Sequence, residues 1–181
     1  MNLDTRLSRS IHETTKKSWV LRHLAVFCAD DLIWLMIGVV YGVTLWNVPK
    51  TAPQFLLVAL MLGLGLFVPW VVTTIISRIA KRPRPYKKHG YEPIIKPFIE
   101  THSFPSSHAT FVFALAFMPI NAEFFVWMLV AATLVALGRV AVGVHYLSDI
   151  AAGMLIGALG GKMFLLIMYV VTLTRFDHLF I

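Results

Sequence analysis

Charged residues and cysteine are both scarce in this chain, and each shortage excludes some kinds of protein. Charged side chains make up 14% of the 181 residues and hydrophobic ones 58%, whereas about 25% charged is usual for a soluble domain. A small domain has too much surface for its volume to hide that much apolar area from water. The composition therefore excludes a disordered chain and indicates a lipid bilayer as the solvent. The single cysteine, Cys28, excludes an intramolecular disulfide.

Acidic residues are the scarcer of the two charged kinds, because 16 Lys and Arg stand against 9 Asp and Glu, a net charge of +7. Such a balance points to an anionic partner, which is a lipid headgroup, a phosphorylated substrate or nucleic acid. The basic residues border apolar stretches and form no separate soluble module. We therefore expect one membrane-embedded domain over residues 1–181, with an anionic lipid as its partner and no nucleic acid.

Long stretches without charge predict membrane helices, because a span needs about 20 apolar residues. Asp30 and Asp31 interrupt the first stretch, and we expect them at the interface or in the bundle interior. There they cap or pair helices, or they contact the substrate or a basic loop. Several glycines in the last stretch allow close helix packing. The chain is therefore expected to be all-α, a helical bundle of five transmembrane spans over residues 24–46, 51–77, 104–122, 124–138 and 150–174.

Residues 1–23 mix basic and apolar side chains. Leu3, Leu7 and Ile11 recur at a four-residue spacing, which places them on one face of a helix. We interpret this segment as an N-terminal amphipathic helix that lies in the membrane interface. The alternative interpretation is a solvated tail.

A basic, proline-rich loop over residues 78–103 breaks the apolar pattern after the second expected span. A polar island at residues 139–149 follows the fourth expected span. Because an even number of crossings separates the two, both lie on one side of the membrane. The N-terminus and the start of the third span share that side. Polar residues from several parts of the sequence therefore converge there.

Three polar clusters stand out at this side: Lys81, Arg82 and Arg84; Ser106, Ser107 and His108; and Arg139, His145 and Asp149. Arginine forks bind tetrahedral oxyanions through two parallel hydrogen bonds. The second cluster opens an expected helix, whose free backbone N–H groups favour an anion. His145 and Asp149 are one helical turn apart, so the carboxylate can reach one imidazole nitrogen and leave the other as base or nucleophile. The clusters together predict a phosphate site with two histidines in distinct roles.

The clusters resemble the three motifs of the type-2 phosphatidic acid phosphatase family over roughly residues 24–170. The matching residues are Arg84-Pro85, Pro105-Ser106-Ser107-His108 and Gly138-Arg139-x5-His145-x3-Asp149. The family patterns are Lys-x6-Arg-Pro, Pro-Ser-Gly-His and Ser-Arg-x5-His-x3-Asp. This chain departs from them at three positions. Ser77 stands in place of the lysine, whose charge Arg78 or Lys81 would supply, while Ser107 replaces a glycine and Gly138 a serine.

The resemblance implies a role for each residue. His145 is the implied nucleophile, which attacks phosphorus to form a phosphohistidine, and Asp149 orients it. His108 is the implied acid, which protonates the leaving oxygen and then activates water. No cofactor and no metal is implied, because the arginines repel a cation and stabilise the phosphate in its place. The implied phosphate ligands are Arg84, Arg139, Ser106, Ser107, Lys81 and Arg82.

The short chain and the run Ala29-Asp30-Asp31-Leu32 are most similar to the small bacterial undecaprenyl-diphosphatase branch. That branch implies hydrolysis of undecaprenyl diphosphate to the monophosphate, in the service of cell wall biosynthesis. Phosphatidylglycerophosphate and phosphatidate phosphatases carry the same motifs and are the alternative. A non-enzymatic anion carrier or channel is an alternative of another class, but it needs accessible polar groups on both membrane faces.

The side of the membrane on which the motifs lie is predicted differently by two arguments. The positive-inside rule places the basic face in the cytoplasm. The resemblance implies the extracytoplasmic face of the inner or plasma membrane. Several of the basic residues belong to the expected site, which weakens the positive-inside argument. We expect the extracytoplasmic face, and we leave the oligomeric state open.

Overall fold

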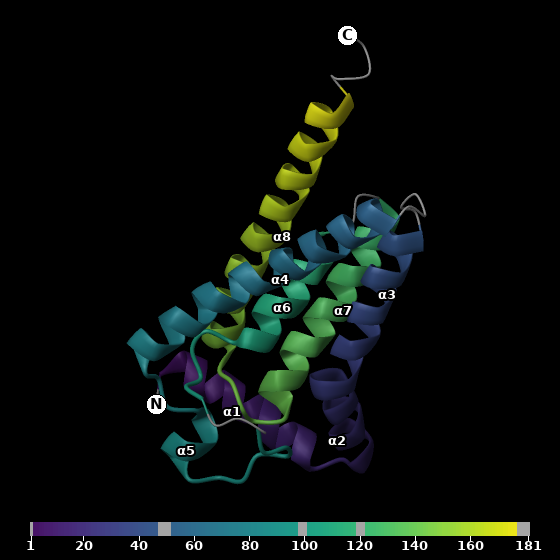
Figure 1. The fold of residues 1–181 in the computed structure, drawn as a ribbon. Coiled ribbons are helices and arrows are strands. Elements are labelled where there is room, and N and C mark those ends of the chain that lie inside the picture. The colour runs from purple at the N-terminus through teal and green to yellow at the C-terminus, as the bar shows by residue number, and fades with distance from the viewer. Residues whose placement is uncertain (1, 47–51, 98–100, 119–121, 177–181) are drawn as a thin grey trace.

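The computed structural model describes residues 2–46, 52–97, 101–118 and 122–176 (Figure 1). Within these residues, every regular element is a helix. The helices are α1 (Leu3–Lys16), α2 (Trp19–Val26), the π-helix η1 (Phe27–Asp31), α3 (Leu32–Trp46), α4 (Ala52–Ala80), α5 (Pro85–His89), α6 (Ser107–Ala116), α7 (Ala122–Ala141) and α8 (Leu147–Phe176). The all-α expectation is confirmed.

Within the described residues, four helical segments are long and apolar enough to cross a membrane. They cover Trp19–Trp46, Phe55–His89, Phe124–Ala141 and Leu147–Val170. The third expected span, residues 104–122, corresponds to α6, which has 10 residues, a length of about 15 Å against a hydrocarbon core of about 30 Å. The end of that expected span, at residues 119–121, lies outside the described residues. The expected count of five spans therefore stays a prediction.

Helix α6 lies in the centre of the bundle, against α3, α4, α7 and α8 (Figure 1). Its side chains from Val112 to Ala116 are buried, and Leu115 is fully so. Backbone outside a helix is tolerated at membrane depth where protein covers it, so a central helix need not span the bilayer alone. Large apolar side chains instead cover the outside of the long helices, where Trp34, Trp127 and Leu159 are exposed.

Glycines bring α8 against α6 along a row at four-residue spacing. A Cβ atom added to Gly153 would lie 2.6 Å from the carbonyl oxygen of Ser106, and one on Gly157 would lie 2.3 Å from that of Thr110. Both distances are shorter than van der Waals contact, so only glycine permits this approach. The expected close packing is confirmed, and it joins the start of α6 to the start of α8.

Helix α1 forms as expected, and Asn2 caps its N-terminus by accepting a hydrogen bond from Thr5 N. Its buried face is polar, however, and consists of Thr5, Ser8, His12 and Thr15. Leu3 and Leu7 are 69% and 47% exposed. Leu3 and Leu7 therefore lie on the face turned away from the bundle, which an amphipathic helix in the membrane interface would turn to lipid, whereas Ile11 packs against the core. The interfacial position itself stays a prediction.

The polar clusters gather at one end of the bundle, as the crossing argument predicts. Figure 1 shows α1 and α5 at the end where α4 and α7 finish and where α6 and α8 begin. The expected loop 78–103 begins later than predicted, because α4 continues to Ala80, and residues 98–100 lie outside the described part. Lys81 then turns the chain with a positive φ of 48°.

Candidate active site

Asp149 lies in the first turn of α8 and is fully buried. Its Oδ2 atom accepts a hydrogen bond from the backbone N–H of Tyr146 at 2.8 Å. Its Oδ1 atom accepts one from Arg82 at 2.7 Å. Both carboxylate oxygens are therefore bonded, and a buried carboxylate held in this way has a fixed orientation.

His145 lies just before α8 and is almost completely buried. Its Nδ1 atom donates a hydrogen bond to the carbonyl oxygen of Ser103 at 2.9 Å and lies 3.5 Å from Asp149 Oδ2. A carbonyl only accepts, so Nδ1 carries the proton and Nε2 keeps its lone pair. Burial lowers the pKa of His145 to about 4, although Asp149 opposes that shift. The ring is therefore neutral at pH 7, as a nucleophile must be.

His108 lies in the first turn of α6, which Ser106 caps by accepting a hydrogen bond from Ala109 N at 3.4 Å. Ser106 N also donates to the carbonyl oxygen of Asp149 at 3.0 Å, which ties the starts of α6 and α8 together. The His108 ring has no hydrogen-bond partner among the described residues, and it lies within electrostatic reach of Arg139, His145 and Arg84. It is therefore available to a substrate at a helix N-terminus that favours anions.

Arg139 is buried near the end of α7, and η1 holds it in place. Its NH1 nitrogen donates to Asp30 Oδ1 at 2.5 Å and to the carbonyl oxygen of Ala29 at 3.4 Å. Its Nε–H is buried without a hydrogen-bond partner among the described residues. A buried donor of this kind is costly unless a ligand completes it, so Arg139 fits a phosphate ligand. Of the two readings of Asp30, the helix-pairing one is confirmed.

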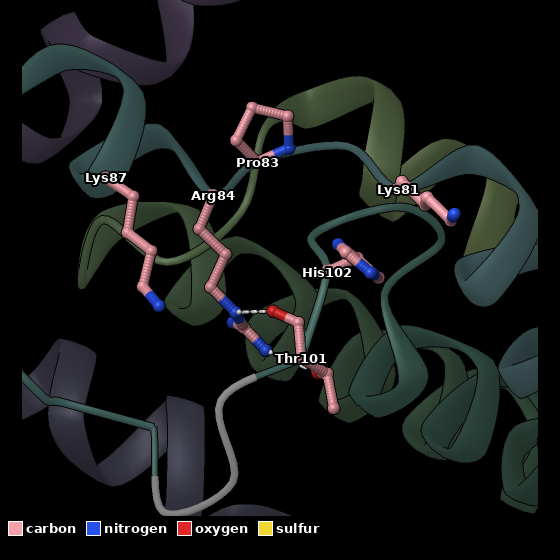
Figure 2. A pocket seen from close by; sticks show the side chains of 6 residues that line it. All are labelled: Lys81, Pro83, Arg84, Lys87, Thr101 and His102. Carbon is pink, nitrogen blue, oxygen red and sulfur yellow. Dashed lines mark hydrogen bonds between the residues drawn. The ribbon is translucent and has the colours of Figure 1, made fainter.

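Arg84 is also buried, and it borders a pocket of about 300 Å³ (Figure 2). Its Nε and NH2 nitrogens donate to the carbonyl and hydroxyl oxygens of Thr101 at 2.9 and 3.0 Å, and NH1 donates to the carbonyl oxygen of Val144 at 3.3 Å. The pocket walls also carry cationic or titratable groups that sequence reasoning did not assign to the site. The lining residues are Lys81, Pro83, Arg84, Lys87, Thr101 and His102.

Arg82 contacts acidic and hydroxyl side chains of the protein itself. Its NH1 nitrogen donates to Asp149 Oδ1 at 2.7 Å and to Ser148 Oγ at 2.6 Å, while NH2 donates to Asp4 Oδ2 at 2.8 Å. The guanidinium therefore pairs with two carboxylates of the protein itself. Its expected role as a phosphate ligand stays a prediction.

The structure places the remaining expected phosphate ligands in different surroundings. Lys81 and Arg78 are both exposed, but only Lys81 lines the pocket that Arg84 borders. This favours Lys81 as the substitute for the lysine missing at Ser77, and the substitution stays a prediction. Ser107 is half-buried at the start of α6. Ser103 is a site residue that sequence reasoning missed, since it fixes the His145 ring from 42 positions away. Among the described residues, no three His, Cys, Asp or Glu side chains are grouped as a metal site requires.

Two histidines, a buried carboxylate and buried arginines around a helix N-terminus, in a bundle of membrane-type helices, define a membrane phosphatase. Residues 54–173 match the profile of the PAP2 superfamily. The chain belongs to that family, and it is a hydrolase that acts on lipid phosphates.

Relatives of known name agree with this class. The chain is 30% identical over 166 residues to YbjG of Escherichia coli K12, which is provisionally assigned as an undecaprenyl-diphosphatase, over 88% of this chain and 79% of YbjG. It is 31% identical over 144 residues to the decaprenylphosphoryl-5-phosphoribose phosphatase of Mycobacterium tuberculosis, over 78% of this chain and 73% of that protein.

Solved structures share the fold at lower identity. LpxE of Aquifex aeolicus superposes with a TM-score of 0.67 at 21% identity, covering 91% of this chain and 96% of LpxE. A phosphatidylglycerolphosphate phosphatase of Bacillus subtilis superposes with a TM-score of 0.63 at 20% identity, covering 89% of this chain and 82% of that one. These likenesses support a membrane helical bundle.

Proposed function

We propose that the protein removes the terminal phosphate of a polyprenyl diphosphate, most simply undecaprenyl diphosphate, through a phosphohistidine. The observation that carries the proposal is the His145 ring, whose Nδ1 proton is bound by Ser103 and whose Nε2 lone pair is left for attack. Around it stand His108, Arg84 and Arg139, which are within electrostatic reach of one another.

The first half-reaction forms a bond from His145 Nε2 to the terminal phosphorus and breaks the bond from that phosphorus to the bridging oxygen. His108 gives a proton to the leaving oxygen, so the lipid departs as the monophosphate. Asp149 and the Ser103 carbonyl stabilise the positive charge that the His145 ring gains. Arg84, the Nε–H of Arg139 and the N-terminus of α6 stabilise the negative charge on the phosphoryl oxygens.

The second half-reaction reverses these roles. His108, now without its proton, takes one from a water molecule, whose oxygen attacks the phosphohistidine. The N–P bond breaks, inorganic phosphate leaves, and the neutral His145 is restored. Fixed cations carry the electrostatic part of both steps, so this scheme requires no metal ion.

The polyprenyl chain is the part of the substrate that the two curated relatives have in common. Both names contain a polyprenyl unit, while they differ in the group that carries the phosphate. The Mycobacterium tuberculosis relative makes a phosphate monoester on a polyprenyl-linked pentose the second candidate. Phosphatidylglycerophosphate and phosphatidate remain the glycerolipid alternatives.

Phosphate release from a panel of lipids tests this proposal. Detergent-solubilised protein is assayed with undecaprenyl diphosphate, decaprenylphosphoryl-5-phosphoribose, phosphatidylglycerophosphate and phosphatidate, with the His145→Ala variant as the control. We expect the highest kcat/KM for the diphosphate. A higher value for the pentose phosphate would select the second candidate, and a higher value for either glycerolipid would contradict a polyprenyl substrate.

We also propose that the polar end of the bundle faces the extracytoplasmic side, where a lipid diphosphate carrier would be regenerated. Glu92 is exposed beside α5 at that end. The Glu92→Cys variant, in a Cys28→Ala background, should react with a membrane-impermeant maleimide in intact cells. Labelling only after lysis would place the active site in the cytoplasm.

A further inference from the structure

The first turn of α8, which carries Asp149, is completed by side chains of α1. Ser8 Oγ accepts a hydrogen bond from Leu147 N at 3.0 Å, and Asp4 Oδ1 accepts one from Ser148 N at 3.1 Å. The first N–H groups of a helix have no partner inside it and are usually bonded by a residue next to them in sequence. Here the partners lie 139 and 144 positions away.

Arg82 connects α1 to the carboxylate of the site. Asp4 Oδ2 accepts hydrogen bonds from Arg82 at 2.8 Å and from Ser148 Oγ at 2.5 Å. The same guanidinium donates to Asp149 at 2.7 Å and lies 3.9 Å from the centre of the Tyr146 ring. Three fixed contacts of this kind leave the guanidinium little freedom to turn.

Asp4 carries its charge at neutral pH. Burial opposes ionisation, but hydrogen bonds from Ser148 and Arg82 outweigh it and lower the pKa of Asp4 below its usual range. One arginine is therefore shared between two carboxylates, one on α1 and one in the active site. A helix that served only as a membrane anchor would need its apolar and basic residues, but it would not need Asp4 or Ser8 turned toward the bundle.

We propose that Asp4 is a positioning residue of the active site, which acts through Arg82 to hold Asp149 and, through Asp149, the His145 ring. This inference deepens the proposed function and rests on it. Helix α1 is then a working part of the catalytic apparatus. If Asp4 is neutralised, Arg82 is no longer held from two sides, and Asp149 is the one carboxylate with which it still pairs, so more of the negative charge of Asp149 is neutralised by Arg82. The carboxylate then supports the developing positive charge on His145 less well.

The test compares kcat and KM for phosphate release by the full-length wild type and by Asp4→Asn. Asparagine keeps an oxygen for the Ser148 N–H but loses the charge that pairs with Arg82. We expect kcat to fall roughly 10- to 100-fold, the range typical of groups that orient a catalytic ligand, while KM changes little. The matched control is Glu13→Gln on the same helix, where a half-exposed carboxylate pairs with Arg9 at 3.9 Å, and it should keep the wild-type kcat.

A double-mutant cycle separates positioning from a general loss of structure. If Asp4 acts through Arg82, adding Asp4→Asn to Arg82→Gln lowers kcat no further. Additive losses, or a wild-type kcat in Asp4→Asn, would overturn the inference while leaving the proposed function intact. A wild type that releases phosphate from no lipid would instead overturn the proposed function, and this inference with it. Thermal unfolding of each variant shows whether it is folded in the assay.

Discussion

Arg82 and Arg84 stand two positions apart in the same basic segment, yet their surroundings differ. Arg82 binds the carboxylates of Asp4 and Asp149, at 2.8 and 2.7 Å. Arg84 donates to the carbonyl oxygens of Thr101 and Val144 and lines a pocket with further basic groups. Arg82 therefore pairs with carboxylates of the protein, whereas Arg84 donates to carbonyl and hydroxyl oxygens and borders the pocket of Figure 2. Sequence position does not separate these roles, because partners far along the chain assign them.

The largest effect should separate the two arginines directly. Arg84→Gln should lower kcat/KM by roughly 10²- to 10³-fold, the loss typical of one group that stabilises transition-state charge, and it should raise KM. Arg82→Gln should lower kcat by roughly 10- to 100-fold with little change in KM. Steady-state kinetics of phosphate release measures both. A larger rise of KM in Arg82→Gln than in Arg84→Gln would reverse the comparison.

His145 is the proposed nucleophile, and the pH dependence of kcat/KM reports whether its ring is neutral. Attack requires the neutral ring, and burial lowers the pKa of His145 from 6.5 to about 4. The acidic limb of log kcat/KM should therefore fall near pH 4 rather than near pH 6.5. A return to pH 7 after exposure to acid serves as the control for unfolding. An acidic limb near pH 6.5 that is fully reversible would contradict the buried, neutral ring.

The same shift predicts the pH dependence of stability. The unfolded chain takes up the proton near pH 6.5 and the folded chain only near pH 4, so the unfolded state binds more protons between these values. The free energy of unfolding therefore falls as the pH falls through this window, by about 3 kcal/mol at most. Unfolding of wild type and His145→Gln, compared at pH 7 and pH 5, measures the part of this contribution that is lost above pH 5, about 2 kcal/mol.

The close contact between α6 and α8 fixes the distance between the helix that carries His108 and the helix that carries Asp149. A single added methyl group should disturb this contact. Gly157→Ala places a Cβ atom 2.3 Å from the carbonyl oxygen of Thr110, whereas Gly42→Ala on α3 meets nothing within 4 Å. Overpacking of this kind costs about 1–3 kcal/mol, so Gly157→Ala should lower the unfolding temperature and Gly42→Ala should not. Equal unfolding temperatures would mean that the helices pack less closely than the structure shows.

The smallest expected effect is that of removing metal ions. If arginines and a helix N-terminus supply the positive charge, incubation with EDTA should leave the turnover rate unchanged. Vanadate, which resembles the five-coordinate phosphoryl centre, should still inhibit. Loss of activity in EDTA, restored by an added divalent ion, would show that fixed cations do not suffice.

Part of the site was predictable because it depends on short spacings. His145 and Asp149 are one helical turn apart, and Ser106 begins a helix as a capping serine does. The convergence of the clusters followed from counting membrane crossings. The residues that orient these groups were not predictable, because their contacts are long-range. Ser103 reaches His145 across 42 positions, Asp4 reaches Arg82 across 78, and Asp30 reaches Arg139 across 109.

Helix α1 shows that an apolar pattern has different meanings in water and beside a bilayer. In water, apolar residues mark the buried face of a helix, but beside a bilayer they mark the face that is turned to lipid. The exposed Leu3 and Leu7 and the buried Ser8 and His12 are arranged as the second rule expects, while Ile11 packs against the core. The glycine at position 138 has a steric explanation, because a Cβ atom there would lie 2.9 Å from the backbone nitrogen of Ala29. The serine of the family pattern would not fit against η1.

The central claim, that His145 is the nucleophile and His108 the acid and base, is tested most directly by trapping the phosphoenzyme. An aryl phosphate labelled at phosphorus needs no proton on its leaving group, so the His108→Ala variant should still be phosphorylated. Its second step should slow by roughly 10²- to 10⁴-fold, the contribution of one general base. The account predicts an acid-labile, alkali-stable label that accumulates on His108→Ala and never on His145→Ala. Labelling of His145→Ala, alone or equally with His108→Ala, would contradict it.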